Sequence, residues 1–148
     1  MNQSSIESPR PPIILLDLNY TLVENNPARG TTPVRMEKRL AGERYRQWLV
    51  DLVRPHTVVL ITARPESWML KTLDRIEDQT GWRPQDAYFA PTGWRNPPAI
   101  KEHLLRNGVF PFYGQDRRYL AIESNPRTRW MYARFSISCF WVTEEGTL

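Results

Sequence analysis

Three short apolar runs, each of which stops at a polar residue, constrain the fold of this chain most. They lie at residues 12–18, 57–62 and 118–123. Consecutive apolar positions over so short a stretch are typical of a strand that is buried on both faces. Weaker strand patterns occur at residues 87–90 and 138–142. Between the strands, helical patterns are found at about residues 33–53, 65–79, 97–106 and 126–135.

This alternation of buried strands and helices predicts parallel strand pairing through right-handed crossovers. The expected fold is an α/β three-layer sandwich with a central, mostly parallel five-stranded sheet. In such sheets, ligands bind at the carboxyl ends of the strands, near the point where the strand order reverses. We therefore expect the functional residues to follow directly after the strands.

The length of 148 residues is typical of one domain, and we expect a flexible leader at residues 1–12 and the folded domain at 13–148. No apolar run is long enough to span a bilayer, and the first residues lack the apolar core of a signal peptide. The sequence therefore predicts a soluble, cytoplasmic protein with no membrane partner. Cys139 is the one cysteine and there are two histidines, which excludes an internal disulfide and a cysteine-based zinc site. Any metal is expected to be held by oxygen.

The formal net charge is +4, and the chain has 6 tryptophans. Most of its basic residues are arginine, which binds phosphate in a bidentate manner and stacks on rings. This composition suits a phosphate-bearing or nucleic-acid partner. A GC-rich coding bias explains the arginines equally well, and the chain has no basic tail.

Polar residues that can take part in catalysis or ligand binding follow the predicted strands. Asp17 and Asn19 come after the first run, Thr62 ends the second, and Glu123 ends the third. Lys101 lies on the helix expected at 97–106. Taken singly, each has an ordinary structural explanation, as a helix cap, a solvated helix residue or an exposed loop acid. Together, at the same edge of one sheet, they favour a functional site.

The segments around these residues resemble the four motifs of the haloacid dehalogenase (HAD) superfamily. The first motif of that family, DxDx(T/V), is similar to the run from Asp17 to Thr21. The second is similar to the segment around Thr62, the third to the one ending at Lys101, and the fourth to the one around Glu123. In the fourth motif, Glu-Ser replaces the usual acid pair. The resemblance covers residues 12–142, nearly the whole chain.

The resemblance implies a Mg²⁺-dependent phosphomonoester hydrolase in which Asp17 is the nucleophile and becomes an aspartyl-phosphate. Asp17, the backbone carbonyl of Asn19, and Glu123 would hold Mg²⁺, which needs only one or two carboxylates besides water and substrate. Thr62 would donate a hydrogen bond to a phosphoryl oxygen. Lys101 would hold Asp17 and the phosphoryl group together and offset the developing charge.

Asn19 departs from the family pattern at the position that matters most for catalysis. In HAD phosphatases, an aspartate there protonates the leaving oxygen and later activates water, and an amide can do neither. The loss of general acid–base catalysis costs roughly 10²–10⁴-fold in rate. Three alternatives follow: a slow phosphatase, an enzyme that uses another acid, or a phosphate- or nucleic-acid-binding module derived from a phosphatase.

The spacing of the motifs leaves no room for a large cap domain over the site. Only some forty residues separate Thr21 from Thr62, and about as many separate Thr62 from Lys101. An uncapped site stays open to bulky ligands. We therefore expect a phosphorylated substrate such as a nucleic-acid end, with a protein phosphate as the other possibility.

Two Gly-Trp-Arg tripeptides flank the third predicted strand. The second contains Trp94 and Arg95 and leads into the Lys101 helix, so these two side chains are candidates for stacking on a base and contacting a phosphate. Arg64, two residues after Thr62, is another candidate for a substrate phosphate, unless it forms an ion pair with Glu66 or a nearby acid. For both Trp94 and Trp82, the alternative is packing in the core.

Within the superfamily, the similarity is greatest to the 3′-phosphatase domain of phage polynucleotide kinase/phosphatase. The residues that carry it are those of 121–142, where the last acidic motif leads into a helix and a Cys-Trp-containing strand, and those around Lys101. This resemblance implies a nucleic-acid 3′ end as the substrate. The Gly-rich phosphate loop of a kinase is absent from this sequence, so no kinase activity is implied.

Overall fold

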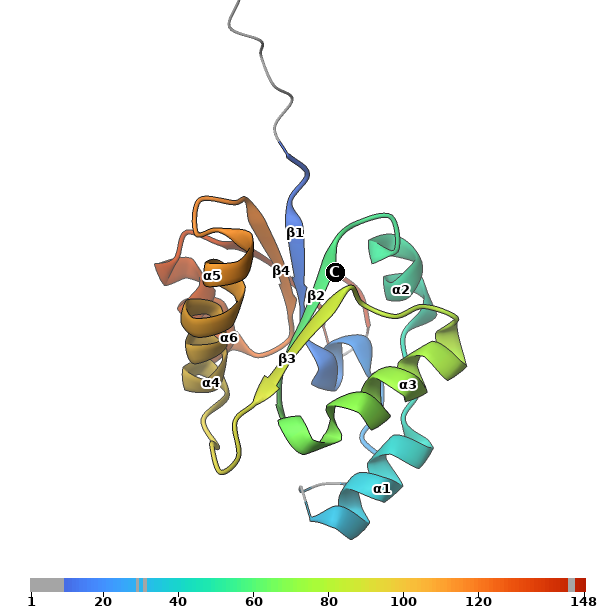
Figure 1. Ribbon diagram of the computed structural model, residues 1–148. Helices are drawn as coiled ribbons and strands as arrows, with labels where there is room; N and C mark the ends of the chain where they lie inside the picture. Colours follow the sequence, from blue (N-terminus) through green and yellow to red (C-terminus); the bar gives the residue numbers. More distant parts are fainter. Residues whose placement is uncertain (1–9, 29, 31, 144–145) are drawn as a thin grey trace, which may run out of the picture.

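The structure, a computed structural model, describes residues 10–28, 30, 32–143 and 146–148. At its centre is a five-stranded sheet in which every pairing is parallel. The strands are β1 (Ile13–Leu16), β2 (Val58–Pro65), β3 (Asp86–Ala90), β4 (Tyr119–Glu123) and β5 (Ser138–Trp141), in the order β3-β2-β1-β4-β5. The predicted α/β sandwich is confirmed, and the sheet is parallel throughout (Figure 1).

Helices cover both faces of the sheet (Figure 1). On one side lie α1 (Pro33–Gly42), α2 (Gln47–Val53) and α3 (Met69–Thr80), and on the other lie α4 (Pro97–Leu104), α5 (Phe110–Tyr113) and α6 (Pro126–Arg134). Side chains alternate across a strand, so β1 contributes Ile14 and Leu16 to one apolar core and Ile13 and Leu15 to the other. Burial on both faces explains why this strand is apolar at every position.

The strand order reverses between β1 and β4. From β1 the chain builds outward through β2 to β3, then returns past β1 to form β4 and β5. A crevice at the carboxyl ends of the strands is expected at such a reversal. Asp17 follows β1 and Glu123 ends β4, so the topology brings these two acids to the same point.

The prediction of one continuous helix over residues 33–53 is wrong, because the structure has two helices there, α1 and α2, with a break between them. Glu43 leaves the helix in an extended conformation, and Tyr45 forms an isolated antiparallel bridge with Val23. Both side chains are buried. The carboxylate of Glu43 contacts the guanidinium of Arg64, so a contact distant in sequence ends the helix.

The segments between the motifs are part of the sandwich. Between Thr21 and Thr62 the described residues form α1 and α2, and between Thr62 and Lys101 they form α3, β3 and the start of α4. The described part of the chain therefore holds no large cap, as the spacing predicts. Of the predicted leader, residues 1–9 lie outside the described residues, and 10–12 run without regular structure into β1.

No helix among the described residues combines the length and the apolar character needed to cross a membrane.

Gly108, in the helical segment η3 (Leu105–Val109) that joins α4 to α5, allows a close contact with β3. A Cβ atom added at Gly108 would collide with the ring of Tyr88. We expect Gly108→Ala to lower the free energy of unfolding by about 1–3 kcal/mol, the usual cost of overpacking, although alanine favours helix. Urea unfolding measures this loss. The double variant Gly108→Ala/Tyr88→Ala is expected to lose less than the sum of its two parts, and additive losses would contradict the collision.

The single cysteine, Cys139, lies half-buried on β5. Burial, and to a lesser degree the charge of Glu123, raise the pKa of its thiol to about 12. Because the thiolate is the reactive form, we expect native Cys139 to react with iodoacetamide at pH 8 far more slowly than the urea-unfolded chain does. Alkylation followed by mass spectrometry measures both rates, and equal rates would contradict the prediction.

Candidate functional site

An ammonium group lies between two carboxylates where the strand order reverses. Lys101, on α4, donates a hydrogen bond of 2.6 Å to Asp17 Oδ1 and another of 2.6 Å to Glu123 Oε2. All three side chains are buried. The structure thus brings together three residues that are 84 and 22 positions apart in the sequence.

The electrostatics of this cluster keep Lys101 charged. Burial alone would lower the pKa of Lys101, but the carboxylates of Asp17 and Glu123 outweigh it, and the pKa is raised. Burial and the charge of Asp17 raise the pKa of Glu123, and Lys101 opposes them. Two carboxylates thus share one cation in a buried cluster, where charges interact more strongly than in water.

Oxygen atoms gather on the other side of Asp17. Thr21 Oγ1 donates a hydrogen bond of 2.6 Å to Asp17 Oδ2 and lies 3.0 Å from Ser124 Oγ. The hydroxyl of Ser124 is in turn 3.4 Å from the backbone carbonyl of Asn19. A carboxylate, a carbonyl and two hydroxyls therefore lie side by side at the mouth of the sheet.

These oxygens fit the requirements of Mg²⁺, a hard cation that takes oxygen ligands, keeps several waters and needs one or two carboxylates. Within the described residues, no three His, Cys, Asp or Glu side chains form a metal-binding group. Glu123 Oε2 accepts a hydrogen bond from Lys101, and Oε1 accepts the backbone N–H groups of Ser124 and Asn125, each at 3.1 Å. Each carboxylate oxygen of Asp17 accepts one hydrogen bond. The candidate metal ligands are therefore the oxygens of Asp17, Asn19, Thr21 and Ser124.

The turn that follows β1, η1 (Leu18–Leu22), sets the position of these oxygens. Leu18 and Leu22 are fully buried and anchor it. Between them, Tyr20 adopts a left-handed conformation with φ 62° and ψ 1°. For a residue with a side chain, this conformation costs on the order of 1–3 kcal/mol and is found most often at functional sites. Tyr20 is 54% exposed, and its hydroxyl accepts a hydrogen bond of 2.8 Å from Asn26 Nδ2.

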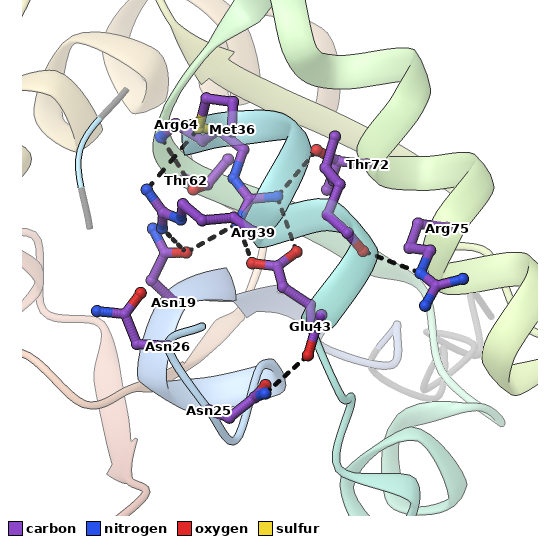
Figure 2. Close-up of polar contacts among 12 residues, drawn as sticks. Asn19, Asn25, Asn26, Met36, Arg39, Glu43, Thr62, Arg64, Thr72 and Arg75 are labelled. Atoms are coloured by element: carbon purple, nitrogen blue, oxygen red, sulfur yellow. Dashed lines mark hydrogen bonds and ion pairs between the residues drawn. The ribbon is translucent and has the colours of Figure 1, made fainter. Parts of the chain in front are cut away.

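The side chain of Asn19 contacts two arginines, Arg39 and Arg64 (Figure 2). Asn19 Oδ1 accepts hydrogen bonds from Arg39 Nη2 at 2.9 Å and from Arg64 Nη2 at 3.1 Å. The Nε–H groups of both arginines are buried and have no partner among the described atoms. This cluster therefore has more N–H donors than acceptors.

Arg64, a predicted substrate contact, is fully buried in the structure. Its guanidinium forms an ion pair with both carboxylate oxygens of Glu43, and Nη1 also donates to Thr72 Oγ1 at 3.0 Å (Figure 2). From the sequence, an ion pair is the alternative to a phosphate contact for Arg64. The structure has such a pair, but it is buried and its acid is Glu43 rather than Glu66. Arg64 reaches the site through its contact with Asn19.

The other predicted contacts lie in different environments. Thr62, expected at the end of its strand, is buried within β2, which continues three residues further to Pro65, and its Oγ1 accepts the backbone N–H of Arg64 at 3.1 Å. Trp94 is 44% exposed in the loop before α4, with its ring 4.6 Å from that of His103, and Arg95 beside it is exposed. Trp82 packs in the core, which confirms the alternative to base stacking for this residue.

A hollow of about 560 Å³ opens next to the oxygen cluster, and sequence reasoning missed it. Its lining includes Tyr20, Arg46, Ser124 and Trp141. The edge position of β5 was the available signal for Trp141, since an edge strand is covered by a neighbouring strand on one side only. Nothing in the sequence indicates the left-handed turn that exposes Tyr20.

The fold of this chain is similar to that of chains in the Pnkp1/Rnl/Hen1 RNA repair complex. One such chain superimposes with a TM-score of 0.67 and 16% identity, over 89% of this chain and 42% of that one. A second has a TM-score of 0.68 and 15% identity, over 89% of this chain and 45% of the other. The chain thus spans less than half the length of these neighbours. The sequence matches no model of a known protein family and no curated protein.

At this level of identity, the likeness defines the class of fold alone, a parallel α/β sandwich.

Proposed function

We propose that this chain is a HAD-like, Mg²⁺-dependent phosphomonoester hydrolase that acts on a nucleic-acid end. The observation that carries the proposal is the position of Asp17, a carboxylate at the strand reversal held on one side by Lys101 and on the other by Thr21. The fold likeness to chains of an RNA repair complex supports a nucleic-acid end as the substrate.

Asp17 is the nucleophile in this proposal. One of its carboxylate oxygens forms a bond to phosphorus while the bond from phosphorus to the leaving oxygen breaks, and the leaving oxygen takes a proton from water. Water then attacks phosphorus, the bond to Asp17 breaks, and inorganic phosphate leaves. Lys101 stays charged throughout and offsets the negative charge that develops on Asp17 and the phosphoryl oxygens.

Magnesium would be held by Asp17, the carbonyl of Asn19 and the hydroxyl oxygens of Thr21 and Ser124. Glu123, expected as a ligand from the sequence, is not in this set, because its oxygens accept hydrogen bonds from Lys101 and from two backbone N–H groups. When bound, it supplies the positive charge that lets an anionic carboxylate approach a phosphoester dianion. Thr62 lies two residues beyond Leu60, which pairs with the last residue of β1, and is proposed to orient a phosphoryl oxygen.

The second candidate function, a binding module without catalysis, is favoured by Asn19. Its amide has no proton to donate to a leaving oxygen at neutral pH and cannot activate water. Both of the arginines that contact it are donors, a suitable environment for an anion.

Release of phosphate from p-nitrophenyl phosphate and from 3′-phosphorylated RNA and DNA oligonucleotides tests the proposal. We expect slow, Mg²⁺-dependent release from the wild type and none above background from Asp17→Asn. Asp51→Asn, an exposed acid on α2, is the matched control and should behave as the wild type. Equal release by wild type and Asp17→Asn would overturn the proposal. Saturable phosphate binding without release would favour the binding module.

A further inference from the structure

Two hollows beside the site share one wall. The hollow of about 560 Å³ reaches Tyr20 and Ser124 at the oxygen cluster, and a second of about 360 Å³ reaches Arg129 and Trp130 on α6. Pro126 and Trp141 line both. The two hollows therefore adjoin each other at Pro126 and Trp141, one beside the candidate site and the other against α6, and together they are called the groove.

Three large rings are exposed along this groove. Trp130 is 76% exposed, Tyr20 54% and Trp141 39%. Rings of this size contribute most when they are buried, so their exposure along one groove points to a ligand that covers them. Tyr20 has a left-handed backbone conformation, which is unfavourable for a residue with a side chain and which glycine adopts freely.

Two cations lie beside these rings. The guanidinium of Arg129 lies 4.7 Å from the centre of the Trp141 ring. Arg46, whose Nε donates to the carbonyl of Thr21 at 2.9 Å, lines the hollow nearer the site. The acid in that lining, Glu24, is paired with Arg44 at 2.9 Å. Among the described residues, Arg46 and Arg129 form no ion pair, so the part of the groove that the structure describes presents positive charge beside flat aromatic surfaces.

We propose that this groove binds the nucleotides next to the phosphorylated end of a single-stranded nucleic acid. Bases stack on Trp141, Trp130 and Tyr20, and Arg46 and Arg129 contact the backbone phosphates, as in single-strand sites that combine aromatic platforms with a positive groove. The direction of the strand rests on the proposed function, which places its terminal phosphate at Asp17.

Equilibrium binding of a labelled 3′-phosphorylated oligonucleotide tests the groove without depending on catalysis. We expect Trp141→Ala and Trp130→Ala each to raise Kd roughly 5- to 150-fold, the usual effect of removing a base-stacking ring. Tyr20→Gly is expected to weaken binding while keeping the fold, because glycine suits the turn. Trp48→Ala, which removes an indole with 38% exposure on α2, is the matched control and should bind as the wild type.

The cation contacts have their own control. Arg129→Gln is expected to reduce the slope of log Kd against log salt by about 0.7, the value for one phosphate contact on a single strand. Arg106→Gln removes a guanidinium 4.9 Å from the ring of Phe135 and should leave the slope unchanged.

Separate outcomes distinguish the groove from the proposed function. Wild-type Kd values for Trp141→Ala and Trp130→Ala would overturn the groove, even if phosphate release depends on Asp17. Weaker binding by these variants, with no phosphate release by any protein, would support the groove and overturn the hydrolase. Self-association that disappears in Trp130→Ala, without an effect on oligonucleotide binding, would assign the rings to a protein contact and overturn the proposal.

Discussion

The variant Lys101→Met is expected to lose about 3–5 kcal/mol of its free energy of unfolding, the usual cost of removing one partner from a buried ion pair. Methionine fills nearly the same volume, so the loss is electrostatic: Asp17 and Glu123 remain buried without the cation that lies 2.6 Å from each. Urea unfolding in EDTA measures it. Lys71→Met breaks an exposed pair with Glu37 and should cost less than about 1 kcal/mol.

The pH dependence of this loss identifies its cause. Burial and Asp17 raise the pKa of Glu123 from 4.5 to about 8, and Lys101 opposes them, so its removal raises that pKa further. A group whose pKa is raised by folding destabilises the folded state as pH rises through the interval between the two values. Relative to wild type, the loss in Lys101→Met should therefore be larger at pH 9 than at pH 7, because Glu123 of the folded wild type is largely ionised at pH 9 while that of the folded variant keeps its proton to higher pH. An equal loss at both pH values would point to packing instead.

The fold could be predicted because its main signal is local. Residues 13–16 of β1 serve two cores at once, and a strand of this kind must be apolar throughout. The break between α1 and α2 could not be predicted, because the helical pattern continues through it. It depends on Glu43 reaching Arg64, 21 residues away, and on Tyr45 pairing with Val23.

The candidate site was predictable to the extent that topology determines it. A reversal of strand order brings the ends of β1 and β4 together, so Asp17 and Glu123 follow from the sheet, and Lys101 from the helix that packs beside it. The environment of Arg64 depends on Glu43, and the exposure of Tyr20 depends on one left-handed residue. Neither has a local sequence signal, because each is set by tertiary contacts.

The two arginines at Asn19 determine what a carboxylate would do at that position. Arg39 and Arg64 donate to Asn19 Oδ1 at 2.9 and 3.1 Å, and burial together with the Arg64 charge lowers the pKa of Arg39. A negative charge is favourable here, since the two guanidiniums face one carboxylate, that of Glu43. An aspartate at position 19 would stay ionised at neutral pH. In that form it accepts a proton from water but has none to give to a leaving oxygen.

Asn19→Asp is therefore expected to accelerate phosphate release unequally for two substrates. With p-nitrophenyl phosphate, whose leaving group needs little protonation, the gain should approach about 10²-fold, the lower end of general acid–base catalysis. With a 3′-phosphorylated oligonucleotide, whose leaving oxygen needs a proton, it should be smaller. Adding Arg39→Gln removes one guanidinium, raises the pKa of the new carboxyl group and should recover part of the difference.

Steady-state kinetics with both substrates measure these gains, and Asn107→Asp, which places the same change at an exposed position of the helical segment η3, is the control. Equal gains for the two substrates would show that the carboxyl group at position 19 titrates freely and that the arginines do not hold it ionised. No gain with either substrate, in a protein that still depends on Asp17, would show that proton transfer at position 19 does not limit the reaction, and another group would then have to supply the acid.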